Sequence, residues 1–224
     1  MGSNQTGLKP EEVNSAIDQA LNSGNDVMNA LEAGFKGILE SLKSNWGTQD
    51  GKTWVEGPCC TEMDSIATKV AENLSKIGEV ISAVGNAQIK DTSNAQACKA
   101  ASPVGTKKVT GFQMNDKLSN GYIGVYSELL EDLKTKEDEC LTKVDEKIGE
   151  LQTRVIAKTD VAFNKVGAAD KVSAECTIYI NRVKTTITQG LTSLNTAITT
   201  NTSKADEFVK SIQDAGLRGA NGGN

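Results

Sequence analysis

The chain has 224 residues, with 24 Lys and Arg against 29 Asp and Glu, no His, five Cys and only 4% aromatic residues. Without histidine, Ser-His-Asp or Cys-His catalysis and histidine-ligated zinc are excluded. A net charge of −5 argues against a protein that binds a nucleic-acid backbone. Low aromatic content and 38% hydrophobic residues predict long helices, each with one narrow buried stripe.

Neither export through the general secretory route nor insertion into a membrane is expected. No apolar run of signal-peptide length follows Met1. No later stretch approaches the roughly 20 apolar residues that a membrane-spanning helix needs.

The first helix is predicted over residues 10–45, after a flexible lead at 1–9. Pro10 suits the first helical position, and Glu11 and Glu12 are favourable in the first turn. Apolar or small residues then recur at alternating steps of four and three, the spacing of one buried helix face. They are Ile17, Leu21, Gly24, Met28, Leu31, Phe35, Ile38 and Leu42.

A second helix is predicted from about residue 50 to 90. Two glycines and an aspartate at 47–51 end the first helix and permit a tight reversal. Pro58 is expected to kink the second helix or to mark a local restart. The apolar stripe comprises Trp54, Met63, Ile66, Val70, Leu74, Ile77, Ile81 and Val84. The two helices predict an antiparallel hairpin over 10–90.

The helical pattern is lost over residues 91–117, which read as a connector rich in turn-forming residues. Patterning resumes at about 118, with Tyr122 and Tyr126 on the apolar stripe, and the chain reverses again at Gly167. A second helical hairpin is therefore predicted over 118–215.

The expected fold is all-α, with two long antiparallel hairpins packing as an elongated four-helix bundle. A narrow stripe on each helix means that neither hairpin can bury its apolar face alone. The alternative is that each hairpin pairs with another chain. The glycine-rich tail at 216–224 is expected to be disordered.

The cysteines are expected to be reduced thiols. They have no Cys-x-x-Cys spacing, and adjacent Cys59 and Cys60 are poorly placed for a mutual disulfide. Cys140 and Cys176 fall on apolar stripes, so we expect them to act as small core residues. The alternative for Cys59 and Cys60 is a reactive pair, because the start of a helix lowers thiol pKa.

One segment carries a specific pattern. Trp46 and Gly47 lie at the first reversal, and Trp54 follows eight positions after Trp46. This segment resembles the Trp-x-Gly (WXG, ESAT-like) superfamily, small helical-hairpin proteins exported by bacterial type VII secretion systems. In that family the glycine usually stands two positions after the tryptophan, where this chain has Thr48, although glycine directly after it is tolerated. The resemblance covers about residues 10–90.

The rest of the chain departs from a single family hairpin. Its length is similar to two fused hairpins or to the longer LXG targeting domains. Members of the family or their partners often carry Tyr followed four positions later by Asp or Glu. Here Tyr122 is followed at that spacing by Tyr126, Tyr126 by Leu130, and Tyr179 by Val183. This departure leaves autonomous export open, and the alternative is that a partner chain supplies the export signal.

As the resemblance implies, the expected function is that of a non-enzymatic type VII secretion substrate or secretion partner that acts through helical protein–protein interactions. Its implied partners are a secretion motor ATPase, a second WXG-like protein or toxin, or a second copy of the chain. Trp46, Gly47 and Trp54 would form the recognition tip or its support. The implied location is the cell surface or the medium, with a cytoplasmic pool. No cofactor, metal or nucleic acid is expected.

Other interpretations of the sequence remain open. The heptads alone also suit a structural or adaptor bundle unrelated to secretion, such as a phage component or a sensor bundle. In that case the two tryptophans only stabilise a hairpin. Catalysis is disfavoured because acidic runs such as 137–139 lie in a charge-rich helix without an arranged nucleophile. Narrow stripes and acidic to neutral polar faces disfavour stable membrane insertion.

Overall fold

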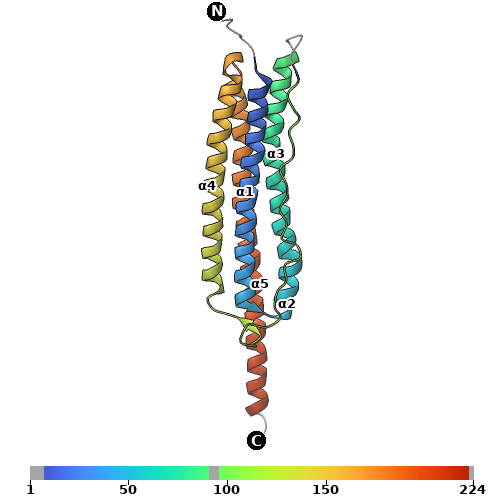
Figure 1. Cartoon of the computed structure of the whole chain (residues 1–224). Coiled ribbons are helices and arrows are strands. Elements are labelled where there is room, and N and C mark those ends of the chain that lie inside the picture. The colour runs from blue at the N-terminus through green and yellow to red at the C-terminus, as the bar shows by residue number, and fades with distance from the viewer. Residues whose placement is uncertain (1–7, 91–95, 222–224) are drawn as a thin grey trace, which may run out of the picture. The chain divides into compact units, whose positions relative to one another are not determined.

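The fold is an all-α helical bundle, as the heptad spacing predicts. The computed structural model describes residues 8–90 and 96–221, with residues 90 and 212–221 described for their backbone alone. The four long helices are α1 (Pro10–Asn45), α3 (Cys60–Lys90), α4 (Leu129–Phe163) and α5 (Ala169–Asn221). Figure 1 shows them in chain order from blue to red.

The chain divides into two compact units, and each contains a segment of every long helix. Unit 1 comprises residues 1–31, 66–107 and 142–188. Unit 2 comprises residues 32–65, 108–141 and 189–224.

In unit 1, α1 and α3 run antiparallel at very close range. A Cβ atom placed on Gly85 would lie 2.7 Å from Cγ1 of Val13, and one placed on Gly24 would lie 3.6 Å from Cβ of Leu74. The apolar stripes of the four segments form the core, and predicted stripe members such as Ile17, Met28 and Leu31 are buried. At the second reversal, Gly167 takes the left-handed conformation (φ 66°) that ends helices, which confirms the predicted turn.

In unit 2, α1 and α4 also run antiparallel. A Cβ atom on Gly34 would lie 2.2 Å from Sγ of Cys140, so glycine sets the distance between the helices. Farther along, the Ser41 hydroxyl donates a 2.7 Å hydrogen bond to Asp132. Asn45 donates to the same carboxylate oxygen at 3.2 Å, which fixes the end of α1 against the start of α4.

The predicted irregularity at Pro58 is a change of helix type. The short helix α2 (Gln49–Trp54) is followed by a π-helical turn, η1 (Val55–Cys59), before α3 begins. Pro58 lies inside that turn, where its missing N–H and its ring are incompatible with an ordinary α-helical ladder. The wider turn leaves both Cys59 and Cys60 buried.

The second hairpin begins later than predicted. Helix α4 starts at Leu129, and the region from 118 holds turns and the two-residue strand β2 (Gly124–Val125). Tyr122 is 71% exposed rather than on a buried stripe. The reason is local, because Gly121 has a φ of +83°, which a helix cannot contain.

The far end of α5 also differs from the prediction. The helix continues to Asn221, through most of the segment 216–224 for which the sequence predicts disorder. Thr202 is buried, but Phe208 on the same predicted stripe is 60% exposed.

Two further expectations fall largely outside the described residues. These are the flexible lead at 1–9 and the first part of the connector at 91–117. The described part of the connector, from residue 96, contains no helix. Among the described residues, no helix is both long and apolar enough to cross a membrane.

Candidate functional site

The candidate site is the first reversal, which lies in unit 2. Trp46 and Gly47 form strand β1 (Trp46–Gly47), which pairs antiparallel with β2 through Trp46 opposite Val125 and Gly47 opposite Gly124. The Tyr126 N–H donates to the carbonyl of Asn45 at 2.8 Å. This bond gives a partner to a carbonyl at the end of α1, where no further helical turn can supply one.

Trp46 is a core residue of this turn. Its side chain is 1% exposed, and its indole N–H donates a 2.9 Å hydrogen bond to Oγ1 of Thr48. The half-buried ring of Trp54 lies 5.9 Å from the Trp46 ring, centroid to centroid, at an interplanar angle of 34°. This distance is within the range of favourable aromatic pairs. The two tryptophans therefore connect the residue that follows α1 to the last residue of α2.

Thr48 organises the turn from its centre. It is the N-cap of α2, and its Oγ1 accepts the Gly51 N–H at 3.0 Å while it also accepts the indole N–H of Trp46. One hydroxyl therefore satisfies a helix-terminal amide and a buried indole together.

Two glycines permit close approaches at the site. A Cβ atom on Gly47 would lie 2.2 Å from the backbone nitrogen of Leu118, so a side chain there would displace the connector. A Cβ atom on Gly51 would lie 2.4 Å from Cε2 and Nε1 of Trp46. Gly47 thus makes room for backbone, and Gly51 makes room for the indole.

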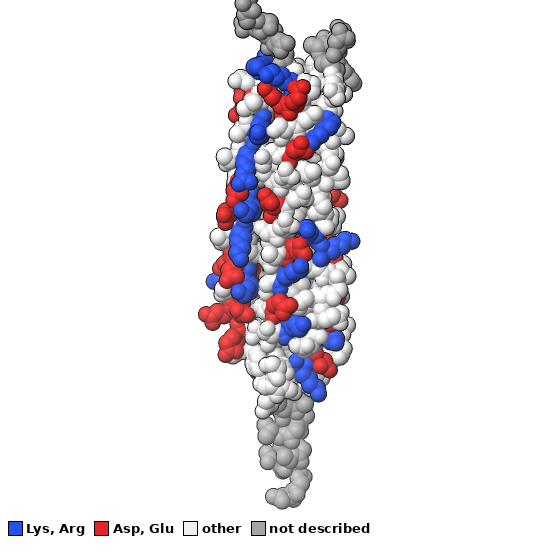
Figure 2. Space-filling model, viewed as in Figure 1, with Lys and Arg blue, Asp and Glu red and all other residues white. Residues whose placement is uncertain are grey.

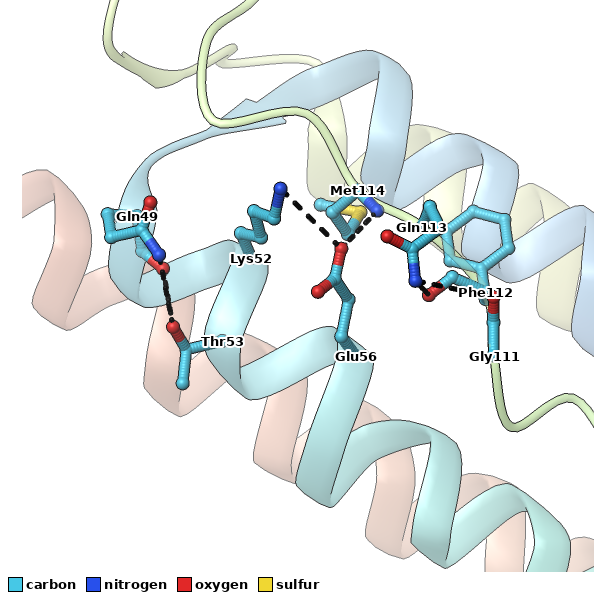
Figure 3. A network of polar contacts seen from close by, with 8 residues as sticks. All are labelled: Gln49, Lys52, Thr53, Glu56, Gly111, Phe112, Gln113 and Met114. Atoms are coloured by element: carbon cyan, nitrogen blue, oxygen red, sulfur yellow. Dashed lines mark hydrogen bonds and ion pairs between the residues drawn. The ribbon is translucent and has the colours of Figure 1, made fainter.

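The connector is fixed to this end of unit 2 by acidic side chains, one of which, Glu56, is drawn in Figure 3. Glu56 accepts the Met114 N–H at 2.7 Å, and the Lys52 ammonium lies 4.0 Å from the same carboxylate oxygen. Asp64 accepts the Val109 N–H at 2.7 Å. These carboxylates recognise backbone amides, which a charged acceptor binds more strongly than a neutral one does.

A groove of about 560 Å³ opens beside the turn. It lies between the start of α2, the connector and the last part of α5, and two of its apolar residues, Ile123 and Phe208, are each 60% exposed. A smaller pocket of about 160 Å³ brings Phe208 together with Trp46 and Trp54. The larger groove is lined by Thr48, Gln49, Asp50, Asp116, Lys117, Ile123, Ala205, Phe208 and Val209.

Charged side chains of both signs are interspersed over the face of the molecule drawn in Figure 2. The residues that line the groove also include charges of both signs, the acidic Asp50 and Asp116 and the basic Lys117. An apolar floor with a mixed polar border is the usual anatomy of a protein–protein contact.

The structure brings together the three predicted site residues, but in different roles. Trp46 is buried and cannot contact a partner directly, Gly47 lies in the strand pair, and Trp54 is half-buried. Sequence reasoning missed the roles of Thr48, Gly51 and Phe208. Threonine three positions before Gly51, just ahead of a helix, is an N-cap pattern that could have identified Thr48.

The thiols lack the properties of a reactive pair. All five cysteines lie among the described residues, are buried and form no disulfide, and the core positions expected for Cys140 and Cys176 are confirmed. Burial, with the neighbouring Cys60 thiol second, raises the pKa of Cys59 to about 12. Burial, with Asp64 and Glu56 nearby, raises the pKa of Cys60 to about 11. Both are protonated at neutral pH, so neither is an activated nucleophile.

One carboxyl group of unit 2 is buried without full hydrogen bonding. Glu137 on α4 is 8% exposed and accepts a hydrogen bond from the Asn195 amide of α5 through Oε2. Within the described part of the chain, its Oε1 has no hydrogen-bond partner. Desolvation raises the pKa of Glu137, with the Asn195 bond acting in the opposite direction.

Comparison of the chain with protein-family models, with curated proteins and with solved structures finds no match.

Proposed function

We propose that this protein is a secretion-associated helical protein of the WXG kind, which acts by binding other proteins rather than by catalysis. Its partners would be a secretion motor ATPase or a second helical hairpin protein. The proposal places its work at the cell surface or in the medium after export by a type VII system.

The observation that carries the proposal is the construction of the first reversal. A buried tryptophan directly after α1 packs at a tilt against a second tryptophan, the last residue of the short helix α2, and glycine lies directly after the first. Trp46 and Trp54 fall on the tryptophan and the later aromatic position of the family pattern. Gly47 stands directly after the tryptophan, which the family tolerates, while the usual glycine position holds Thr48. The turn also supports an apolar groove, which supplies a surface for a partner.

The groove gives the proposal a contact surface. Phe208 and Ile123 line it with large apolar side chains that are each 60% exposed, and aromatic residues such as phenylalanine are enriched at protein interfaces. Thr48 lines the groove, and Trp46 lines the smaller pocket that shares Phe208 with it. We therefore assign the contact to Phe208 and Ile123 and the supporting role to Trp46 and its neighbours.

The test is an export assay in a type VII-bearing host, with and without its motor ATPase. The tagged chain is quantified in the medium against a cytosolic marker, with the host's candidate partner proteins co-expressed. Motor-dependent appearance in the medium supports the proposal. Retention in both strains contradicts it and leaves an intracellular adaptor bundle as the better explanation.

A matched pair of variants tests the surface. Phe208→Ser removes an exposed apolar side chain from the groove, and Ile178→Ser removes a similar one, 50% exposed, from another part of α5 that does not line it. We expect Phe208→Ser to reduce motor-dependent export at least tenfold and Ile178→Ser to leave it unchanged. Equal export of the two variants would show that the groove is not the contact.

A further inference from the structure

Helix α3 carries a repeated pattern that neither the hairpin nor the tryptophan turn explains. A Ser-x-x-Gly sequence occurs twice, from Ser75 to Gly78 and from Ser82 to Gly85, seven residues apart. Seven residues are about two helical turns, so serine and glycine recur on one face at levels about 10.5 Å apart. Both residue types lower helix propensity in a helix interior, so the repeat has a cost that a contact must offset.

The contact is made by the connector of unit 1. We call residues 96–107 the strap. Its burial has a period of three: Cys98 and Val104 are buried, Ala101 is half-buried, and the residues between them are exposed. Three residues per turn is the period of a polyproline II helix, which advances about 9.3 Å per turn. One turn of the strap, about 9.3 Å, is therefore nearly as long as the distance along α3 between its two Ser-x-x-Gly sequences, about 10.5 Å.

Each inward side chain of the strap meets a glycine. A Cβ atom on Gly85 would lie 3.0 Å from Sγ of Cys98, and one on Gly78 would lie 3.1 Å from Cβ of Ala101. On α1, a Cβ atom on Gly24 would lie 2.8 Å from Cγ2 of Val104. The glycines are thus three shallow seats, and only small side chains fit between the helices and the strap.

Side chains of the two helices also recognise the strap backbone. The Asn86 amide is bidentate, since its Oδ1 accepts the Cys98 N–H at 2.8 Å and its Nδ2 donates to the Cys98 carbonyl at 3.4 Å. Both serines of the repeat take part: Ser82 donates to the Lys99 carbonyl at 2.7 Å, and Ser75 accepts the Val104 N–H at 2.9 Å.

Helix α1 supplies the opposite wall. Asn14 accepts the Lys99 N–H at 2.9 Å, and Asn25 accepts the Gly105 N–H at 3.4 Å. The Lys99 ammonium pairs with Asp18. Nearly all of these bonds go to backbone groups, so the two helices bind the strap mainly through its backbone. The glycines accommodate a small side chain of the strap at every third position.

We propose that this face of α1 and α3 is a binding groove for polyproline II segments, with the strap as its ligand in cis. The ligand in trans is an extended segment of a partner protein with small apolar residues three positions apart. The strap holds the groove through small side chains and mostly neutral hydrogen bonds, which a peptide of the same spacing reproduces. Such a segment therefore competes with the strap, and the strap regulates access to the groove.

The test uses a fluorescein-labelled peptide of residues 96–107 in which serine replaces Cys98. It is titrated by fluorescence anisotropy onto the full-length chain and onto the full-length variant Val104→Asp. A carboxylate cannot be accommodated in the seat at Gly24, so this variant releases its own strap. We expect it to bind the peptide at least tenfold more tightly than the unmodified chain does.

Two controls test the seats and the spacing. Gly78→Val, added to Val104→Asp, blocks the middle seat and should abolish binding. Gly149→Val, where a Cβ atom meets nothing within 4 Å, should not. A peptide with one alanine inserted before Val104 breaks the three-residue spacing and should bind at least tenfold more weakly.

The proposal is overturned if Val104→Asp has the circular dichroism of the unmodified chain and yet does not bind the peptide, or if Gly78→Val leaves binding intact. If Val104→Asp does not fold, the groove is tested on the unmodified chain instead. Millimolar peptide should bind it, and oxidising the double variant Gly85→Cys/Val13→Ala should prevent binding until the disulfide is reduced. The cysteine places a second sulfur beside Cys98, and the alanine removes the Val13 methyl groups, the nearer of which the new Cβ atom would otherwise meet at 2.7 Å. Binding that is insensitive to this lock also refutes the groove.

Discussion

Replacing Gly51 by alanine tests the account of the tryptophan turn. The added carbon would lie 2.4 Å from Cε2 and Nε1 of Trp46 and 2.9 Å from Oγ1 of Thr48. Both neighbours are held by the same hydrogen bonds, so the turn must shift as a whole. Overpacking of this kind costs about 1–3 kcal/mol.

The matched control is Gly149→Ala in α4, where the added carbon meets nothing within 4 Å. Alanine gains up to about 1 kcal/mol over glycine in a helix interior, and this gain is common to both variants to a first approximation. The difference in free energy of unfolding between the two variants should therefore be the overpacking cost, about 1–3 kcal/mol. For a chain of this length it corresponds to a difference in Tm of about 2–12 °C.

The assay is urea denaturation followed by tryptophan fluorescence and by circular dichroism at 222 nm. A double-mutant cycle adds Trp46→Phe, which removes the indole atoms that the new methyl group would meet. The penalty of Gly51→Ala should shrink in that background, because the two residues contact each other directly. Equal stability of Gly51→Ala and Gly149→Ala, or a penalty that Trp46→Phe does not change, would refute the packing argument.

The remaining predictions concern single groups. Thr48→Ala should lower the free energy of unfolding by about 0.5–2 kcal/mol through loss of the N-cap, and Thr48→Ser should restore most of it; parity of Ala and Ser in urea melts would contradict this role. Glu137→Leu should raise stability at pH 7 by about 1–3 kcal/mol by removing a desolvated, half-bonded carboxylate. Because burial raises the pKa of Glu137, its charged form is the disfavoured one in the folded state. The gain should therefore be full above the folded pKa and vanish as pH falls below the unfolded value, and a gain that does not change with pH in thermal melts would be contrary to it. Burial raises the pKa of Cys59 and Cys176 to about 12 each, so a thiol reagent at pH 8 should label both only after denaturation. Rapid labelling of the native chain would exclude that burial.

The helices could be predicted because their spacing is a local property of the sequence. The stripe from Ile17 to Leu42 alternates steps of three and four, and its start at Pro10 and end before Trp46 follow from capping and turn chemistry. Gly167 likewise marks the second reversal with a positive φ that other residues rarely adopt.

The sequence-based predictions were wrong where heptad spacing occurs outside a helix, and where tertiary contacts decide which residues are buried. Tyr122 and Tyr126 have heptad spacing, but the glycines around Tyr122 let the chain turn and pair with the first reversal. The stripe on α5 continues through Phe208, and the sequence cannot show that burial stops at about Thr202.

At the candidate site, the tryptophans and Gly47 were predictable, but the surface was not. The pairing of Trp46 with Val125 joins residues far apart in the sequence, and no local pattern indicates it. The groove depends on the same long-range contact, since its walls come from α2, the connector and α5. Of the groove's lining, only the part that Thr48 forms could be predicted from the sequence near the turn.

The strand pair at the first reversal also has a kinetic consequence. Helical hairpins close through contacts between neighbouring segments and form early, because short loops cost little entropy to close. The bridge between Trp46 and Val125 must close a loop of many tens of residues, so it should be among the last contacts to form. The groove beside it is then complete only in a fully folded chain. A partner that binds there would distinguish finished molecules from nascent ones.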